Sequence, residues 1–548
     1  MTYITKFHIE YNNIEIYFFQ VLCYNSSIFL YRNNIIERGK KMENKRGSWA
    51  SNIGFLLAAI GSAVGLGNIW GFPYKMGKCG GFSFLIVYLL LAVFVGMVIM
   101  CSELALGRMT RKAPIAAYKA VSKKYSWLGW LAVIAPFLIM TFYSVLGGYC
   151  IYYIAINIGG LVSGNMPDSS SFGAMLTSIP ASVGVLLAFM VICMVIVAGG
   201  VSGGIEKFNK VGMPALAVML VIIIIKSWTL PNAGEGLKFM FVPGYAVKGG
   251  FIEESPSFIS ILGTAGGQMF FSLSLAMGAM ITYGSYLDKS ENLVKNSVII
   301  VVSDTLVALM AGLAVIPAAV ANGINAGKAV SEIKLNGPNL LFSTLQDVFH
   351  DMGKVGGLFG IIFYLLVLIA AISSAISLME VLTAHFIDRA HEDGREVSSK
   401  KVTFVVSGVI TLLAILVAAD GLGSNGITPS EMFGFKMNTW CDCWLDFMDT
   451  WSEGIAMPVG AMLMGLMIGG ELGPDFMLDE IHNGEHSPTF KSFYKFCITF
   501  VVPVVMCFVL AGQMIDFFGN PTACYIIALV ILVIFAVWTY CFKNKEAK

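Results

Sequence analysis

The sequence predicts an all-α polytopic membrane protein with twelve transmembrane helices. Of its 548 residues, 57% are hydrophobic and 13% are charged, whereas soluble domains contain about 25% charged residues. Apolar runs of roughly 20 residues, the length that crosses a bilayer, recur along most of the chain. The net charge of +1 gives no indication of nucleic-acid binding, and the eleven cysteines lack zinc-ligand spacing.

The twelve spans follow from these apolar runs. We expect them at 51–73, 82–106, 128–158, 180–199, 211–228, 258–287, 293–321, 356–387, 402–419, 443–469, 493–514 and 523–542. Lysine and arginine concentrate in the loops after spans two, four and eight and at the C-terminal end. The positive-inside rule therefore places both termini in the cytoplasm of a protein of the cell membrane.

Residues 1–41 differ from the rest of the chain. They are rich in Asn, Ile and Tyr, and no small-residue cleavage site follows their weakly apolar stretch, so they are a poor signal peptide. We expect a non-native or disordered extension, because Met42 opens a plausible start of the protein. The core of ten helices is then expected at 42–470, and helices 11 and 12 with the C-terminus at 471–548.

The first span contains the stretch GSAVGLGNIWGFP at 61–73, in which glycines and a proline weaken the helix. In lipid, freed backbone groups are tolerated only inside protein or beside a wet cavity, so we expect the helix to open here. An opened helix offers carbonyl oxygens to a cation and amide hydrogens to an anion. This suits a ligand that carries both an ammonium and a carboxylate, and the alternative is a kinked, purely structural helix.

Span six repeats this interruption, with glycines at both ends of residues 263–278. Two interrupted segments five spans apart resemble those of known transporters built from inverted repeats, so an inverted repeat with a site near the midplane is implied by this resemblance rather than by the spacing.

Two further polar features lie inside predicted spans. Asp304 is in span seven, where a carboxylate costs about 2.5–3.5 kcal/mol and usually has a partner. A bound cation is one possible partner, and a protonated, hydrogen-bonded Asp304 is the alternative. Ser373 and Ser374 in span eight offer hydroxyls as hard oxygen ligands, although serines in membrane helices usually bond to their own helix.

Several stretches occur together in one order along the chain. They are 61–73, GGFSF at 80–84, ELALGR at 103–108, GIEK at 204–207 with Met213-Pro214, residues 270–286, and Ser373-Ser374. Together they resemble the neurotransmitter:sodium symporter family, and in particular its prokaryotic amino-acid transporters, from about Arg46 to Gly470. The resemblance implies an inverted repeat of helices 1–5 and 6–10, with helices 1 and 6 broken.

The resemblance also implies a set of binding residues. A first sodium site would use the substrate carboxylate and oxygens of Ala63, Asn68, Ser272 and Asp304. A second sodium site would use oxygens of Gly61, Val64, Ala370, Ser373 and Ser374. The substrate would be surrounded by Ser62, Ala63, Leu66, Gly67, Ile139, Tyr143, Phe271, Ser274, Met277, Ser374 and Leu378. The residues that match an inner gate are Arg46, Trp49, Tyr286 and Asp388.

Three positions distinguish branches of the family. Gly65 stands where monoamine transporters carry an aspartate, so a substrate with its own carboxylate is expected. Asp304 stands where chloride-dependent members have an asparagine, and its charge could replace chloride in balancing sodium. Gly71 replaces an arginine that pairs with the acid matching Asp449. Lys75 lies four residues after Gly71 on the same helix face, so it is the candidate to replace the missing arginine. The alternative is that Lys75 is a solvated lysine and that the outer gate is looser.

These features together predict chloride-independent, sodium-coupled symport of a neutral amino acid by alternating access. Ile139, Met277 and Leu378 would make an apolar pocket, so a hydrophobic or aromatic side chain is expected. A sensor that binds an amino acid without moving it, and a different sodium symporter of the same architecture, are the alternatives. A membrane-embedded enzyme would need a catalytic constellation, and the sequence shows none. The particular amino acid, the sodium stoichiometry and the oligomeric state are not predicted.

Overall fold

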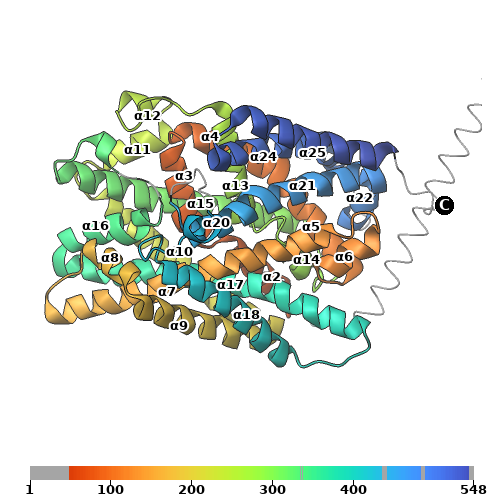
Figure 1. Ribbon diagram of the computed structural model, residues 1–548, viewed down its shortest axis with the longest axis horizontal. Helices are drawn as coiled ribbons and strands as arrows, with labels where there is room; N and C mark the ends of the chain where they lie inside the picture. The colour runs from red at the N-terminus through yellow and green to blue at the C-terminus, as the bar shows by residue number, and fades with distance from the viewer. Residues whose placement is uncertain (1–47, 334, 336, 435–440, 483–487, 542–548) are drawn as a thin grey trace, which may run out of the picture.

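The computed structural model describes residues 48–333, 335, 337–434, 441–482 and 488–541. The predicted extension at 1–41 and the gate candidate Arg46 lie outside these residues. Within the described ranges all regular elements are helices, and most of them run along one common direction (Figure 1). The predicted all-α fold is therefore confirmed.

Ten continuous helical segments of the described chain are long and apolar enough to cross a membrane, and each overlaps one predicted span. They are Phe82–Thr110 (α4, Phe82–Leu91, and α5, Met97–Thr110), Leu128–Ser163 (α7), Ile179–Ala198 (α9), Val201–Trp228 (with α10, Glu206–Trp228), Leu293–Asn325 (α15), Gly353–Glu392 (α17), Ser399–Asp420 (α18), Trp444–Leu472 (α20, Trp444–Asp449, and α21, Met457–Leu466), Thr489–Phe518 (α23, Pro488–Phe496, and α24, Val502–Phe518) and Pro521–Cys541 (α25). The shorter connecting helices are α6 (Pro114–Val121), α8 (Ser170–Thr177), α11 (Ala233–Phe241), α12 (Tyr245–Lys248), α16 (Leu345–Asp351), α19 (Pro429–Phe433) and α22 (Pro474–His482).

The first predicted span is divided. Its first half is α2 (Asn52–Ala63), and its second half is Gly67–Lys78, which ends in α3 (Phe72–Lys78). The two halves meet at an angle of 44°. Val64, which follows α2, has an extended backbone, so the helix opens at the glycine-rich stretch as predicted.

The predicted span 258–287 is divided as well. Helices α13 (Phe258–Ser272) and α14 (Ala279–Gly284) are separated by residues 273–278, where Ser274 and Ala276 have positive φ. The breaks in helices 1 and 6 are thus confirmed. The described chain contains eleven spans when the first divided helix is counted as one, so the total of twelve stays a prediction.

Small residues bring α5 against α14. A Cβ on Gly107 would stand 2.0 Å from the Ile281 carbonyl oxygen, and a Cβ on Gly284 would stand 2.5 Å from the Leu104 carbonyl oxygen. Both distances are far shorter than van der Waals contact, so glycine alone fits. The glycine of the ELALGR stretch therefore allows close helix packing, a common use of small residues in membranes.

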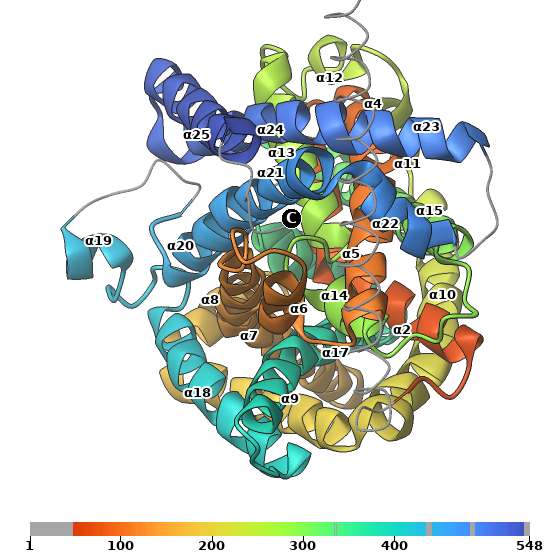
Figure 2. The same ribbon diagram turned by 90° about the vertical axis from the view of Figure 1, so that its right-hand side faces the viewer.

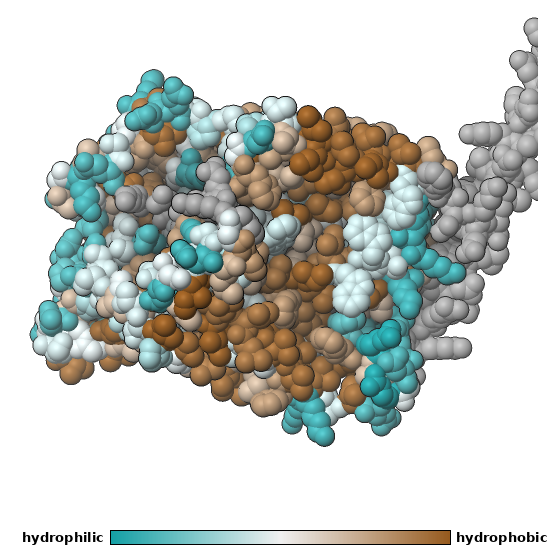
Figure 3. All heavy atoms as spheres, in the orientation of Figure 1, coloured by the Kyte–Doolittle hydropathy of each residue, from teal (hydrophilic) through white to brown (hydrophobic). Residues whose placement is uncertain are grey.

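The bundle surrounds the two broken helices. Helix α14 contacts α2, α5, α6 and α17 and lies near the middle of the end-on view (Figure 2). Helix α25 lies at the edge, with only 17% of its most apolar stretch buried. Hydrophobic residues gather along the sides of the bundle and hydrophilic residues at its two ends (Figure 3), as expected for a membrane protein.

A fully buried arginine connects three segments at the end of α5. Arg108 Nε donates to Glu480 Oε1 of α22 at 2.8 Å, and its Nη1 donates to the Glu291 carbonyl oxygen at 2.6 Å. Arg108 also donates to the main-chain oxygen of Glu480. One guanidinium thereby holds α22 and the 288–292 connection against the end of the second span.

Replacing Arg108 with leucine is expected to destabilise the fold strongly. Removing one partner of a buried ion pair lowers the free energy of unfolding by about 3–5 kcal/mol, because the other charge stays buried without a counter-charge. The measurement is thermal unfolding of the purified protein. Lys112→Leu is the matched control, since Lys112 pairs with Glu392 in a partly exposed site and should cost less than about 1 kcal/mol. Equal destabilisation by both variants would contradict this role of Arg108.

Candidate functional site

The break in helix 1 exposes backbone groups, and side chains from helix 1 itself, α7 and α13 satisfy them. The Leu66 N–H donates to the Tyr143 hydroxyl of α7 at 2.9 Å. The Gly65 N–H donates to Asn68 Oδ1 at 3.0 Å, and the Gly67 carbonyl oxygen accepts from Gln268 Nε2 at 2.8 Å. These three hydrogen bonds hold the opened backbone in one shape. They also give its free N–H and C=O groups the partners that backbone groups need inside a membrane protein.

Asp304 lies at the centre of the first polar cluster and is fully buried. Its Oδ1 accepts from Asn68 Nδ2 at 2.7 Å, and its Oδ2 accepts from Ser272 Oγ at 2.9 Å and from the Tyr88 hydroxyl at 3.3 Å. None of the ion pairs in the described part of the chain involves Asp304. Three donors directed at one carboxyl group fit its ionised form, which a cation would balance.

This cluster joins three residues that the sequence analysis placed in the first sodium site. Asn68 comes from helix 1, Ser272 from the end of α13 and Asp304 from α15. Tyr88 of α4 completes the cluster and was missed as a site residue. The signal available in the sequence was a tyrosine inside an otherwise apolar membrane helix.

The second oxygen cluster lies where α17 passes the end of α2. Ser373 Oγ donates to the Ala370 carbonyl oxygen at 2.8 Å and lies 3.3 Å from that of Val64. Ser374 Oγ lies 3.4 Å from the Gly61 carbonyl oxygen. The structure therefore brings together the five residues predicted for the second sodium site. Ser373 and Ala370 both belong to α17, so this hydrogen bond also fits the alternative that the serine bonds only to its own helix.

The chemistry of both clusters fits a hard monovalent cation. Their members are carbonyl, hydroxyl, amide and carboxylate oxygens, which hard cations prefer. Among the described residues, no group of three or more His, Cys, Asp and Glu side chains could hold a metal ion. The clusters therefore suit sodium better than a transition metal.

Some of the predicted substrate residues come together where the two broken helices meet. Ser274 Oγ donates to the Ser62 carbonyl oxygen at 2.8 Å, which links the two breaks directly. The ring of Phe271 lies 6.3 Å from that of Tyr143, so these aromatic side chains are neighbours. The residues predicted for the apolar pocket are all buried, namely Ile139, Met277 and Leu378.

On the side of α14, two of the predicted inner-gate residues meet. The Trp49 ring packs 6.3 Å from the Tyr286 ring, and its Nε1 donates to the Tyr283 carbonyl oxygen at 3.2 Å. The Tyr286 hydroxyl donates to Glu380 Oε1 of α17 at 2.6 Å, so Glu380 joins this contact. Asp388 Oδ2 accepts from the Ala113 N–H at 2.6 Å.

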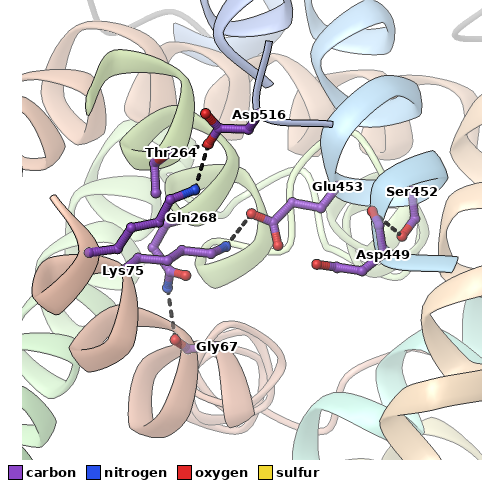
Figure 4. Close-up of polar contacts among 9 residues, drawn as sticks. Gly67, Lys75, Thr264, Gln268, Asp449, Ser452, Glu453 and Asp516 are labelled. Atoms are coloured by element: carbon purple, nitrogen blue, oxygen red, sulfur yellow. Dashed lines mark hydrogen bonds and ion pairs between the residues drawn. The ribbon is translucent and has the colours of Figure 1, made fainter. Parts of the chain in front are cut away.

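At the opposite end, Lys75 forms a buried ion pair with Glu453 (Figure 4). The lysine and glutamate side chains are 8% and 6% exposed. The expected partner was Asp449, so the structure differs from the prediction in the acid. Glu453 stands one helical turn beyond Asp449 on the same helix face, within reach of the flexible lysine stem. The sequence offered one signal for this partner, because Glu453 is a further carboxylate inside the predicted span 443–469.

The surroundings of this pair explain how Gly71 is accommodated. A Cβ on Gly71 would stand 2.7 Å from Gln268 Oε1, so the glutamine side chain fills the place beside the bare backbone. Lys75 Nζ lies 5.9 Å from the centre of the Phe271 ring, within the range of a cation–π contact. The ammonium group thus touches both Glu453 and the aromatic ring beside the predicted substrate position.

A cavity of about 410 Å³ opens outside this pair. Its charged lining residues are Lys75, Lys78, Asp446, Asp449, Glu453 and Asp516. Lys78 Nζ is 2.7 Å from Asp516 Oδ2 in a second, more exposed ion pair. The cavity therefore places several charged side chains beside the Lys75–Glu453 contact, within a lining that also contains apolar residues such as Phe239 and Phe517.

Comparison with protein families assigns residues 46–162 and 175–542 to the sodium:neurotransmitter symporter family. The chain belongs to this family. The resemblance inferred from the motifs is therefore confirmed, and this family member is a sodium-dependent transporter rather than an enzyme.

Two relatives of this symporter are similar over almost their whole length. YhdH of Bacillus subtilis, an uncharacterized sodium-dependent transporter, is 34% identical over 474 residues, which are 85% of this chain and 97% of YhdH. An uncharacterized sodium-dependent transporter of Methanocaldococcus jannaschii is 30% identical over 526 residues, which are 92% of this chain and 99% of the relative.

A solved structure resembles this symporter in its fold. It is the crystal structure of MhsT in complex with L-phenylalanine, with a TM-score of 0.73 and 33% identity. The similarity covers 85% of this chain and 100% of MhsT. The architecture with broken helices 1 and 6 is thereby confirmed as that of the family.

A methyl group at Gly65 of this symporter is expected to damage binding. A Cβ there would stand 2.2 Å from Ser374 Oγ and 2.5 Å from the Tyr143 hydroxyl oxygen. Overpacking costs about 1–3 kcal/mol of folding free energy; a cost of this size carried by the substrate-bound form alone would lower the affinity roughly 5- to 150-fold. The measurement is sodium-dependent amino-acid binding by Gly65→Ala. Gly184→Ala is the control, because nothing lies within 4 Å of its added Cβ; wild-type binding by Gly65→Ala would refute the tight fit.

Proposed function

We propose that this family member imports a neutral amino acid with a hydrophobic or aromatic side chain, driven by sodium and independent of chloride. The observation that carries the proposal is Asp304, a buried carboxyl group with three hydrogen-bond donors beside the break in helix 1. A fixed negative charge there would balance sodium without chloride. The phenylalanine bound to MhsT supports an amino acid as the substrate.

In this proposal the first sodium ion binds at Ala63, Asn68, Ser272 and Asp304, and the substrate carboxylate is a further ligand. Because the substrate carboxylate is also a ligand of the ion, bound substrate raises the affinity for sodium. Bound sodium then raises the affinity for substrate by the same factor. The second ion binds between the end of α2 and Ser373 and Ser374 of α17. It holds these two helices together, so its loss would let them separate.

The substrate lies between the two breaks. Its carboxylate meets the Leu66 and Gly67 amides, which lie at the positive end of the outer half-helix, and the Tyr143 hydroxyl. Its ammonium group meets the Ala63 and Phe271 carbonyl oxygens and the hydroxyl of Ser274. The side chain lies among Ser62, Ile139, Met277 and Leu378, and Phe271 covers it.

Alternating access follows from gates on the two sides of this site. Outside it, Lys75 and Glu453 close over Phe271, with Asp449 one turn away on the same helix. Inside it, Trp49, Tyr286 and Asp388 close the path, and Arg46 is expected to join them. We propose that sodium favours the outward-open form, that substrate permits closure, and that loss of the second ion opens the inner side to the cytoplasm, where both termini lie.

The decisive experiment is uptake into proteoliposomes that contain the purified protein. A panel of labelled neutral amino acids is offered under an inward sodium gradient, with chloride present or replaced by gluconate. Accumulation that needs sodium and ignores chloride is the expected result. A requirement for chloride would refute the role given to Asp304, and binding without accumulation by intact protein would favour the non-transporting sensor.

A further inference from the structure

A groove of about 600 Å³ lies on the outer surface of the bundle, between α7, α17 and α18. Most of its lining is apolar, with contributions from Trp130 and Phe137 of α7, Phe386 of α17 and Val405 of α18. Trp130, Phe386 and Val405 are 54%, 51% and 63% exposed. In a family member that spans the membrane, this surface meets lipid rather than water.

The polar residues of the groove gather at one end. They are Glu396 and Ser398, which directly precede α18, and Lys401 in its first turn. Trp130, near the start of α7, marks the same end, and tryptophan is enriched at the membrane–water boundary. Between Lys401 and Val409 the helix rises by about 12 Å, which approaches the roughly 15 Å hydrocarbon depth of one leaflet.

Two charges of opposite sign remain available at this end. Nearby, Asp393 pairs with Arg389 and Arg395, and Lys112 pairs with Glu392. Glu396 and Lys401 take part in none of the ion pairs of the described chain, and both are exposed. The end of the groove thus offers one carboxylate and one ammonium group to a ligand.

We propose that the groove binds one phospholipid whose headgroup carries a primary ammonium, as in phosphatidylethanolamine. An acyl chain lies along the apolar wall, Lys401 binds the phosphate and Glu396 binds the ammonium. A choline headgroup has no N–H to donate to Glu396, and a glycerol headgroup has no positive charge to meet it. The headgroup chemistry therefore distinguishes this lipid from the common alternatives.

The position of the groove gives the lipid a link to the transport site. Helix α7 carries Tyr143, and α17 carries Ser373 and Ser374. A lipid wedged between these helices and α18 would press on both helices that surround the broken centre. The lipid inference itself rests on the membrane location and the groove, and it stands whichever amino acid is transported.

The test uses quenching of Trp130 fluorescence by lipids with brominated acyl chains. The full-length protein is reconstituted in phosphatidylcholine with increasing fractions of brominated phosphatidylethanolamine, phosphatidylglycerol or phosphatidylcholine. The difference between wild type and Trp130→Phe isolates the signal of the groove. We expect phosphatidylethanolamine to reach half-maximal quenching at a mole fraction about two- to fivefold lower than the other two lipids. This is the difference in affinity that one exposed ion pair can supply.

Headgroup variants make the test specific. Glu396→Gln should abolish the preference for phosphatidylethanolamine, and Lys401→Gln should weaken quenching by all phospholipids. Lys400→Gln is the matched control, because Lys400 adjoins Lys401 but does not line the groove. Equal quenching by the three lipids would overturn the proposal in favour of unselective annular lipid. A preference for phosphatidylglycerol, or no quenching because a second copy covers the groove, would overturn it as well.

Discussion

Replacing Asp304 with asparagine is expected to abolish sodium-driven uptake in chloride-free medium and to restore part of it when chloride is added. The carboxylate accepts hydrogen bonds from Asn68, Ser272 and Tyr88 and is fully buried. The neutral amide of asparagine keeps the shape of the side chain but removes the negative charge that we propose balances sodium. Sodium affinity should fall about 10- to 100-fold, as when a partner of a metal site is removed.

The measurement is the sodium concentration that gives half-maximal uptake, determined in chloride and in gluconate. Asp420→Asn is the matched control, because Asp420 is also fully buried but accepts from the Trp444 N–H, far from the broken helices. This control should lower stability without changing the sodium or chloride dependence. An unchanged sodium requirement in Asp304→Asn would instead support a protonated, structural Asp304.

Replacing Lys75 with methionine is expected to lower both thermal stability and retention of substrate. The ion pair with Glu453 is nearly fully buried, and removing one partner of such a pair costs about 3–5 kcal/mol. The double variant Lys75→Met/Glu453→Met should recover most of the lost stability, since no unbalanced charge from the pair remains. The two single effects would then be strongly non-additive, as expected for residues in contact.

The gating role needs a measurement that a merely structural lysine would not change. We expect Lys75→Met to release bound amino acid to the outer side several times faster than wild type, because Lys75 also lies over the Phe271 ring. The matched control is Lys78→Met, whose pair with Asp516 is partly exposed and should contribute less than about 1 kcal/mol. A lower melting temperature with an unchanged release rate would assign Lys75 to stability alone.

The sequence could predict those features that depend on neighbouring residues along one helix. Hydropathy over about 20 residues locates a membrane span, and glycines within such a span at 61–73 and 263–278 mark where the helix opens. Asp304 could be recognised in the same way, because a carboxyl group in an apolar helix conflicts with its surroundings. The motifs added the family, and through it the grouping of Asn68 and Ser272 with Asp304.

The tertiary structure alone decided the contacts between distant side chains that the family motifs do not imply. Lys75 and Glu453 are 378 positions apart, so spacing along the chain does not say whether the flexible lysine reaches Asp449 or Glu453. The same holds for Tyr88 beside Asp304, for Glu380 beside Tyr286, and for the groove between α7, α17 and α18. Helix formation follows from local composition, whereas these contacts follow from packing, which fixes how each helix is rotated toward its neighbours.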